Sequence, residues 1–245
     1  MSAYGALAAS YDGLMVDGAY RRRAAFLERR LKKSSIPVHT ILDLACGTGT
    51  IACLLAERGY GVLATDGSEE MLTQAAAKAA GLERPPLFLL QAMPRLRLAQ
   101  PVDAVVSTLD SLNYLTRDRD LLETFRRVRR WLKPGGLFLF DVNTPHKLRR
   151  MDGQLYMDET EDSVCVWRTF FSEKKQVCTY QVDLFRLRPD GAWDRRFEEH
   201  RERAWSGETI RQYLAEAGFT FIKLTGDLNG RPPHPDEDRW QFECK

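Results

Sequence analysis

The sequence has few cysteines and histidines, and they form neither a metal-binding pattern nor a disulfide framework. Five cysteines and four histidines occur among 245 residues. The cysteine count is odd and no C-x-x-C spacing is present, so neither paired disulfides nor a zinc site is indicated. Reduced thiols are typical of a reducing compartment. We therefore expect a cytoplasmic protein that holds no metal.

Long hydrophobic runs and a strong charge imbalance are also missing. No apolar run approaches the roughly 20 residues that cross a bilayer. Residues 1–10 show no basic segment followed by an apolar core, so we expect no secretory signal. The formal net charge of +2 is too small to attract nucleic acid by overall electrostatics. We expect neither a membrane nor a nucleic acid as a partner.

The clearest motif that is present covers residues 41–55. It consists of an apolar run of strand length, a Gly-Thr-Gly turn and a helix whose apolar positions recur at helical spacing. Gly47 and Gly49 lack Cβ atoms, so the turn can approach a ligand closely, and the start of the helix offers free N–H groups beside it. The motif predicts a ligand of nucleotide type.

Two acidic residues help to decide which nucleotide fits. Asp43 lies on the strand itself, where a carboxylate would repel a pyrophosphate but attract a ligand with an ammonium group. Asp66 ends the next apolar run and can accept both hydroxyls of a ribose. The spacing Gly47-x-Gly49-x-x-Ala52 also fits a loose dinucleotide pattern. The two acids nevertheless favour a positively charged nucleoside ligand over nicotinamide.

These residues resemble motif I of the class I S-adenosylmethionine-dependent methyltransferases. The stretches that begin at Asp43, Asp66 and Gln91 are similar to the small-molecule branch, the methyltransferase domain 25-like proteins, and the likeness covers nearly the whole chain. The resemblance implies S-adenosylmethionine as cofactor and methyl transfer to nitrogen or oxygen of a small-molecule acceptor. It implies cofactor contacts from Tyr11, Asp43, Ala45, Cys46, Gly47, Gly49, Asp66, Gly67, Met71, Gln91, Ala92, Met93 and Leu109.

The order of elements predicts a doubly wound α/β fold with a mostly parallel, seven-stranded, Rossmann-like sheet and a C-terminal antiparallel strand pair. From Val164 onward, three long alternating stretches predict a small antiparallel β insertion after the fifth strand. It resembles the substrate cap of related methyltransferases. We divide the chain into an N-terminal helical lid (1–35), a cofactor-binding core (36–150), the insertion (151–205) and the C-terminal part of the core (206–245).

The acceptor site and the general base are harder to assign. We expect Asn113 and Tyr114, which follow the fourth strand, and Trp167 of the insertion to face the acceptor, because open parallel sheets bind ligands at the carboxyl ends of their strands. His146 follows the fifth strand and is the first candidate for a base, with Asp110 as a second. A surface role for His146 and a turn role for Asp110 stay open.

Three other functions stay open at this point. Arg23 and Ala92 depart from the family pattern, since relatives often have an aromatic and an aspartate there. The chain could thus be a cofactor-binding module that acts as a partner or regulator. RNA methylation would use the arginine-rich segment 117–130, although the Asn/Asp-Pro-Pro-aromatic signature is absent. A nicotinamide enzyme is the last alternative. A homodimer is also compatible with the sequence.

Overall fold

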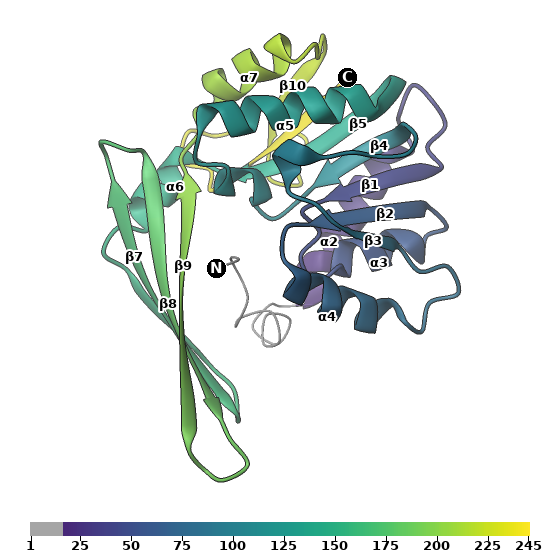
Figure 1. Ribbon diagram of the computed structural model, residues 1–245. Coiled ribbons are helices and arrows are strands. Elements are labelled where there is room, and N and C mark those ends of the chain that lie inside the picture. Colours follow the sequence, from purple (N-terminus) through teal and green to yellow (C-terminus); the bar gives the residue numbers. More distant parts are fainter. Residues whose placement is uncertain (1–16) are drawn as a thin grey trace.

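A seven-stranded mixed sheet forms the centre of the protein (Figure 1) in the computed structural model, which describes residues 17–245. Its strand order is β10-β11-β5-β4-β1-β2-β3. The first five strands in the chain pair in parallel, and β11 runs antiparallel to both β5 and β10. The strands are β1 (Thr40–Leu44), β2 (Gly61–Asp66), β3 (Leu87–Leu90), β4 (Val102–Ser107), β5 (Leu132–Asn143), β10 (Ile222–Gly226) and β11 (Arg239–Cys244). The predicted doubly wound fold is confirmed.

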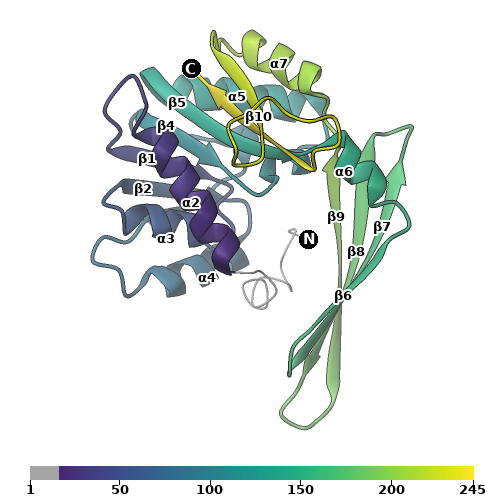
Figure 2. The ribbon, with the colours of Figure 1, turned by 180° about the vertical axis from the view of Figure 1, so that it is seen from behind.

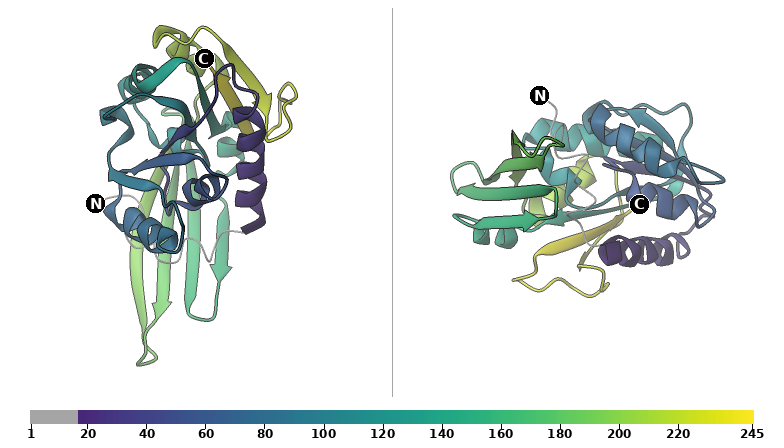
Figure 3. Two further views of the ribbon diagram at one scale, coloured as in Figure 1. Left: turned by 90° about the vertical axis from the view of Figure 1, so that its right-hand side faces the viewer. Right: turned by 90° about the horizontal axis from the view of Figure 1, so that it is seen from below.

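Helices cover both faces of this sheet. They are α2 (Asp17–Leu31), α3 (Thr50–Ala56), α4 (Glu69–Ala79), α5 (Asp118–Trp131) and α7 (Gly207–Glu216). The short helix α6 (Pro145–Arg150) packs instead against the insertion that follows β5, and the 3₁₀ turns η1 (Met93–Arg95) and η2 (Ser111–Tyr114) lie between strands and helices. Neighbouring strand residues point to opposite faces. Ile41 therefore packs with α2 and α3, whereas Leu42 packs with α5 and α7. Figure 2 shows α2 running along one face, and Figure 3 shows the layers from the side.

A second sheet projects from the core after β5 (Figure 1). Its order is β6 (Leu155–Glu159), β7 (Ser163–Ser172), β8 (Val177–Leu187) and β9 (Trp193–Arg203), all antiparallel. We call it the cap sheet. The insertion was expected here, but the prediction of three strands was wrong, because β6 adds a fourth. All five residues of β6 are exposed, so no buried face marks this strand in the sequence.

The base of the cap sheet is fixed to the carboxyl edge of the core. Asn113 of η2 is fully buried, and its side-chain amide donates to the carbonyls of Asn143 (3.1 Å) and Arg203 (2.9 Å). Its Oδ1 accepts from the backbone N–H of Asn143 at 3.0 Å. The ends of β5 and β9 are thereby held next to η2. Within residues 17–245, no helix is both long and apolar enough to span a membrane.

Candidate functional site

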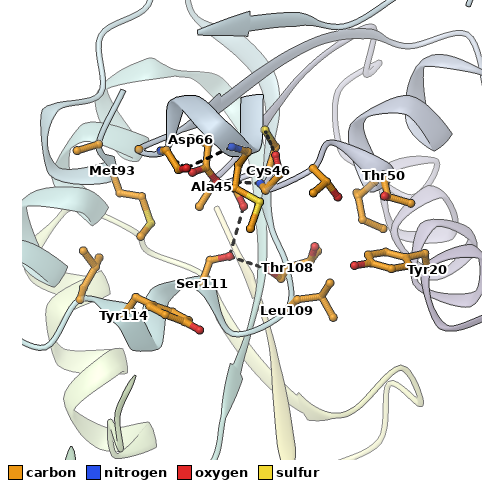
Figure 4. Close-up of a pocket in the computed structure, with 18 of the residues that line it drawn as sticks. Tyr20, Ala45, Cys46, Thr50, Asp66, Met93, Thr108, Leu109, Ser111 and Tyr114 are labelled. Carbon is orange, nitrogen blue, oxygen red and sulfur yellow. Dashed lines mark hydrogen bonds between the residues drawn. The ribbon is translucent and has the colours of Figure 1, made fainter. Parts of the chain in front are cut away.

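A cavity of about 300 Å³ lies at the carboxyl edge of the parallel strands. Segments that follow β1, β2, β3 and β4 form its walls, as expected where parallel strands deliver their loops to one edge. In Figure 4, Tyr20 and Tyr114 stand at opposite sides of it. The lining residues are Tyr20, Ala45, Cys46, Gly47, Thr48, Thr50, Ile51, Asp66, Gly67, Ser68, Met71, Ala92, Met93, Pro94, Thr108, Leu109, Ser111, Tyr114 and Leu115.

The turn after β1 brings the backbone to this cavity, but its two glycines differ in purpose. Both have left-handed φ angles, +55° at Gly47 and +73° at Gly49. A Cβ on Gly47 would meet no atom within 4 Å, and Gly47 lines the cavity. A Cβ on Gly49 would lie 2.8 Å from the Cβ of Ala75 and 3.0 Å from the ring of Phe88. Gly49 therefore allows α3 to pack closely against α4 and β3, and it is not among the lining residues.

Asp66 connects this turn with the end of β2. Its Oδ2 accepts from the N–H of Gly47 and its Oδ1 from the N–H of Ser68, both at 2.9 Å. Burial raises the pKa of the carboxyl, and the N–H groups of Ser68, Gly47 and Gly67 offset only part of that rise. Asp66 thus presents a partly desolvated carboxylate on the cavity wall, where ribose hydroxyls would find an acceptor.

Asp43 is buried in β1, directly before the turn. It is 1% exposed, and across the described part of the chain its Oδ2 finds no hydrogen-bond donor. Burial, followed by repulsion from Asp66, raises its pKa to about 7. Buried acceptors are normally satisfied. An orphaned carboxylate oxygen behind the turn therefore fits a ligand that carries an ammonium group, as the cofactor expected from the sequence does.

Asp43 and Gly49 are not among the residues that line the cavity, but most of the remaining expected cofactor residues are. Ala45, Cys46, Gly67, Met71, Ala92, Met93 and Leu109 line it. Gln91 does not, because its side-chain amide is hydrogen-bonded to the backbone of Arg97 at 3.0 and 2.8 Å. Tyr11 lies outside the described residues. Burial raises the pKa of the Cys46 thiol well above its usual range, which fits a packing residue rather than a nucleophile.

The loop after β4 is held by a buried ionic network. Leu109 and Asp110 both have φ of 58°, and Asp141 accepts from their N–H groups at 3.1 and 2.9 Å. Asp141 is fully buried and pairs with Arg23 (2.9 Å) and with Arg239. Burial raises the pKa of Asp141, but the two guanidinium groups outweigh it, so the net shift is downward. Asp141 therefore stabilises the loop conformation that brings Leu109 to the cavity.

The predicted acceptor and base residues are only partly brought together. Tyr114 lines the cavity, whereas Trp167 lies on β7 of the cap sheet and the Asn113 side chain bonds backbone groups. Asp110 does not line the cavity, and its carboxylate is 2.6 Å from Arg239. His146 lies on α6, beside a different, shallow hollow, with its Nδ1 3.9 Å from the Oδ1 of Asp236. Neither candidate base reaches the cavity.

The lining residues Thr48, Thr50 and Thr108 were not assigned a role from the sequence, whereas Ser111 was expected beside the transferable methyl group. Thr108 and Ser111 flank the β4 loop, and the Ser111 hydroxyl is within hydrogen-bond distance of the carbonyls of Thr108 (2.9 Å) and Ala45 (3.4 Å). Thr48 and Thr50 add hydroxyls from the first turn. Their position after β1 and β4 was a usable signal, because small polar residues at the carboxyl ends of parallel strands commonly bind ligands.

Known proteins provide independent comparisons. Residues 41–136 match the family described as a methyltransferase domain. The chain is 34% identical over 244 residues to a Bacillus subtilis protein named "Putative methyltransferase YqeM", covering 99% of this chain and 96% of that protein.

Two solved structures share the fold. An S-adenosylmethionine-dependent methyltransferase from Clostridium acetobutylicum has a TM-score of 0.87 at 27% identity and covers 99% of this chain and 98% of its own. The sugar N-methyltransferase KedS8 from Streptoalloteichus has a TM-score of 0.75 at 21% identity, with 91% and 87% coverage. Sequence similarity at full length, the strand order and the cavity agree: the chain belongs to the class I S-adenosylmethionine-dependent methyltransferases.

Proposed function

We propose that this protein transfers the methyl group of S-adenosylmethionine to a nitrogen or oxygen atom of a small-molecule acceptor in the cytoplasm. The observation that carries the proposal is the attachment of the cap sheet beside the cavity, through Asn113 to Arg203 at the end of β9. A sheet rooted there can cover a small acceptor. The sugar N-methyltransferase KedS8 matches 91% of this chain, so the shared fold extends beyond the cofactor-binding core.

The binding roles follow from the site geometry. S-adenosylmethionine supplies an electrophilic methyl group on its sulfonium, so the protein mainly has to bind, orient and exclude water. We assign the ammonium group to the orphaned oxygen of Asp43 and the ribose hydroxyls to Asp66. Met71 and Met93 offer apolar surface for the adenine. Ala92 has no side-chain acceptor, so the backbone of this segment takes over the contact with the adenine amine.

The arginine-rich segment that could have served as an RNA footprint is occupied by internal ion pairs. In α5, Arg126 lies 2.7 Å from Glu216 and Arg127 lies 2.6 Å from Glu123. Arg117 pairs with Asp120 at 2.5 Å. The opposite side of α5 packs on the sheet through Phe125 and its neighbours. This pairing supports a solvated helix surface rather than a phosphate-binding face.

The test is transfer of a deuterated methyl group from labelled S-adenosylmethionine into an extract of small bacterial metabolites, with bulk RNA assayed in parallel. We expect mass spectrometry to find a labelled small molecule and no labelled nucleoside. The Asp66→Ala variant, with impaired cofactor binding, is the control for enzyme-dependent labelling. Label in RNA alone would replace this proposal with RNA methylation.

A further inference from the structure

One face of the cap sheet carries most of the exposed large apolar side chains. Ten such side chains occur in the described part of the chain, and six of them lie on this face, 41–64% exposed. Residues that pair directly across strands share a face, so the strand registers place the six together. We call this surface the outer face. The six are Leu155 and Met157 of β6, Phe170 of β7, Leu187 of β8, and Trp193 and Phe197 of β9.

The opposite, inner face of the cap sheet packs on the rest of the molecule. Tyr180 and Val182 of β8 form a buried cluster with Leu148 of α6, and the ring centroids of His200 and Tyr114 are 6.2 Å apart. Side chains alternate between the two faces along a strand, so the outer face points away from both contacts. In Figure 1, the far ends of β7, β8 and β9 extend past the core. An exposed apolar surface of this kind marks an interaction site.

The polar groups at the centre of the outer face are paired within the chain. Asp183 of β8 lies directly opposite Phe197 and is 1% exposed. Its carboxylate is 2.5 Å from Arg168 and 2.6 Å from Arg195, which reach it from the neighbouring strands. Because this carboxylate has two guanidinium partners, covering the face would not leave its charge unpaired. Arginine and aromatic side chains are also the residue types that interfaces favour.

Along β9, the outer face is complementary in charge to itself. Arg195, Phe197 and Glu199 follow one another on this face, so a positive and a negative side chain stand about 7 Å on either side of Phe197. A two-fold axis that crosses the strands at Phe197 would bring each Arg195 opposite the Glu199 of a second copy. Glu199 also pairs with Arg201 of its own chain at 2.7 Å. Such self-complementarity is what a two-fold interface requires.

The size of the outer face also fits a second copy of itself. β8 and β9 each contain 11 residues, so they are roughly 36 Å long, and four strands span roughly 17 Å. The flat area is therefore roughly 600 Å². Protruding side chains raise the accessible area towards the roughly 800 Å² per partner of a standard interface. A second cap sheet has the same length and twist, so it can cover all six apolar side chains at once.

We propose that the outer face of the cap sheet binds the same face of a second copy of this chain, with the two Phe197 rings at the centre of a two-fold interface. This inference goes beyond the proposed function and does not depend on methyl transfer. The inner face and the cavity lie outside the contact, so each copy keeps its own cofactor site. The interface supports the ends of β7, β8 and β9 that extend past the core.

Analytical ultracentrifugation of the full chain over a range of protein concentrations tests the inference. We expect a species of twice the chain mass of 28.1 kDa. Phe197→Glu places two carboxylates against each other at the centre of the interface and should weaken the dimer at least about 100-fold. Leu87→Glu is the matched control and should leave the dimer unchanged, because Leu87 is also exposed, at 59%, but lies on β3 at the edge of the central sheet.

A charge reversal tests the register of the two copies. Glu199→Arg brings an arginine opposite Arg195 across the two-fold axis, so the dimer should weaken several-fold, and the loss should shrink as the salt concentration rises. Glu208→Arg makes the same change in charge at an exposed position of α7 and should have no effect. Circular dichroism and calorimetric binding of S-adenosylhomocysteine should be unchanged in all four variants, which separates a lost contact from a lost fold.

Each contrary outcome overturns a stated part of the inference. A monomer at every concentration, or a dimer that persists unchanged in Phe197→Glu, would overturn the interface. An unchanged dimer in Glu199→Arg would overturn the placement of the two-fold axis at Phe197. Sedimentation of a monomer with vesicles of phosphatidylcholine and phosphatidylglycerol, lost in Phe197→Glu, would assign the outer face to a membrane instead. All of these outcomes leave the proposed methyl transfer standing.

Discussion

If Asp43 binds the ammonium group as proposed, this buried carboxylate makes cofactor binding depend on pH. Its pKa is raised to about 7 from an ordinary value of 3.8. Between these two pH values the folded protein keeps the carboxyl of Asp43 protonated, whereas the unfolded chain loses that proton. The contribution of Asp43 to stability therefore falls as pH rises between these values. A ligand ammonium group beside its orphaned oxygen favours the ionised form. Binding should consequently tighten as pH rises through the folded-state pKa.

We expect calorimetry to show about tenfold tighter binding of S-adenosylhomocysteine at roughly pH 8 than at roughly pH 6, because one pKa unit corresponds to about 1.4 kcal/mol. Asp43→Asn removes the titrating group and should flatten this dependence. Asp66 also has a raised pKa. An unchanged slope in the Asp43→Asn variant would therefore assign the effect to Asp66 or another group.

Asp66 supports a second prediction at the residue scale. Its carboxylate accepts two backbone N–H groups and lies on the cavity wall. Charged hydrogen bonds contribute about 1.5–3 kcal/mol each, so Asp66→Ala should weaken S-adenosylhomocysteine binding by about 10–100-fold in calorimetry. Asp66→Asn is the conservative control and should lose less, because it keeps one acceptor oxygen. An unchanged dissociation constant with an intact melting transition would contradict the ribose assignment.

Among the elements, the turn between β1 and α3 offers a matched pair of substitutions. Gly49→Ala forces a Cβ to 2.8 Å from Ala75 at a left-handed φ, so the free energy of unfolding should fall by about 3 kcal/mol. Gly47→Ala meets open space and should cost about 1 kcal/mol, but its methyl group should weaken cofactor binding at the cavity. Urea unfolding and calorimetry measure the two effects, and equal losses of stability would contradict the assigned roles.

The same elements show what a sequence can reveal. Asp43, Gly47 and Gly49 were recognisable because strand, turn and helix are contiguous, so local spacing already places them together. The base was sought at His146, a loop position after β5, because strand order alone places it near the ligand. The contact of the cap sheet with the cavity wall, between the rings of His200 and Tyr114, depends instead on the pairing of β8 with β9 and on the Asn113 side chain that joins η2 to β9. Local periodicity contains no information about such long-range contacts.

Arg23 is a second example of a long-range contact that the local sequence pattern does not predict. The arginine run of α2 includes Arg22, whose side chain is exposed. Arg23, by contrast, is 6% exposed and bonded to Asp141 at 2.9 Å. The position follows from the docking of α2 on the sheet, which buries one residue of the run next to a carboxylate 118 positions away. Arg23, which departs from the family pattern, therefore forms a buried ion pair with Asp141.

At the scale of the whole molecule, this ionic network connects parts of the chain that are distant in sequence. Asp141 lies on β5, Arg239 on β11 and Arg23 on α2, and the carboxylate also holds the loop after β4. The folded-state pKa of Asp141 is lowered. The stability that it contributes is therefore present above the ordinary carboxyl pKa and is lost as pH falls through the folded-state value.

Asp141→Asn should thus reduce the free energy of unfolding at neutral pH by about 3 kcal/mol, because it removes the buried charge that two guanidinium groups share. Arg239 keeps Asp110 at 2.6 Å and Arg23 keeps Asp227 at 3.5 Å, so the loss should lie at the lower end for a broken buried ion pair. The difference from the wild-type protein should shrink in acid, where the wild-type carboxyl is itself protonated. Urea unfolding across the acid range measures this, and Arg23→Met in both backgrounds completes a double-mutant cycle. Because Leu109 would lose its anchor, S-adenosylhomocysteine affinity should fall as well. A deficit that stays constant down to the acid limb would show that shape, rather than charge, makes Asp141 necessary.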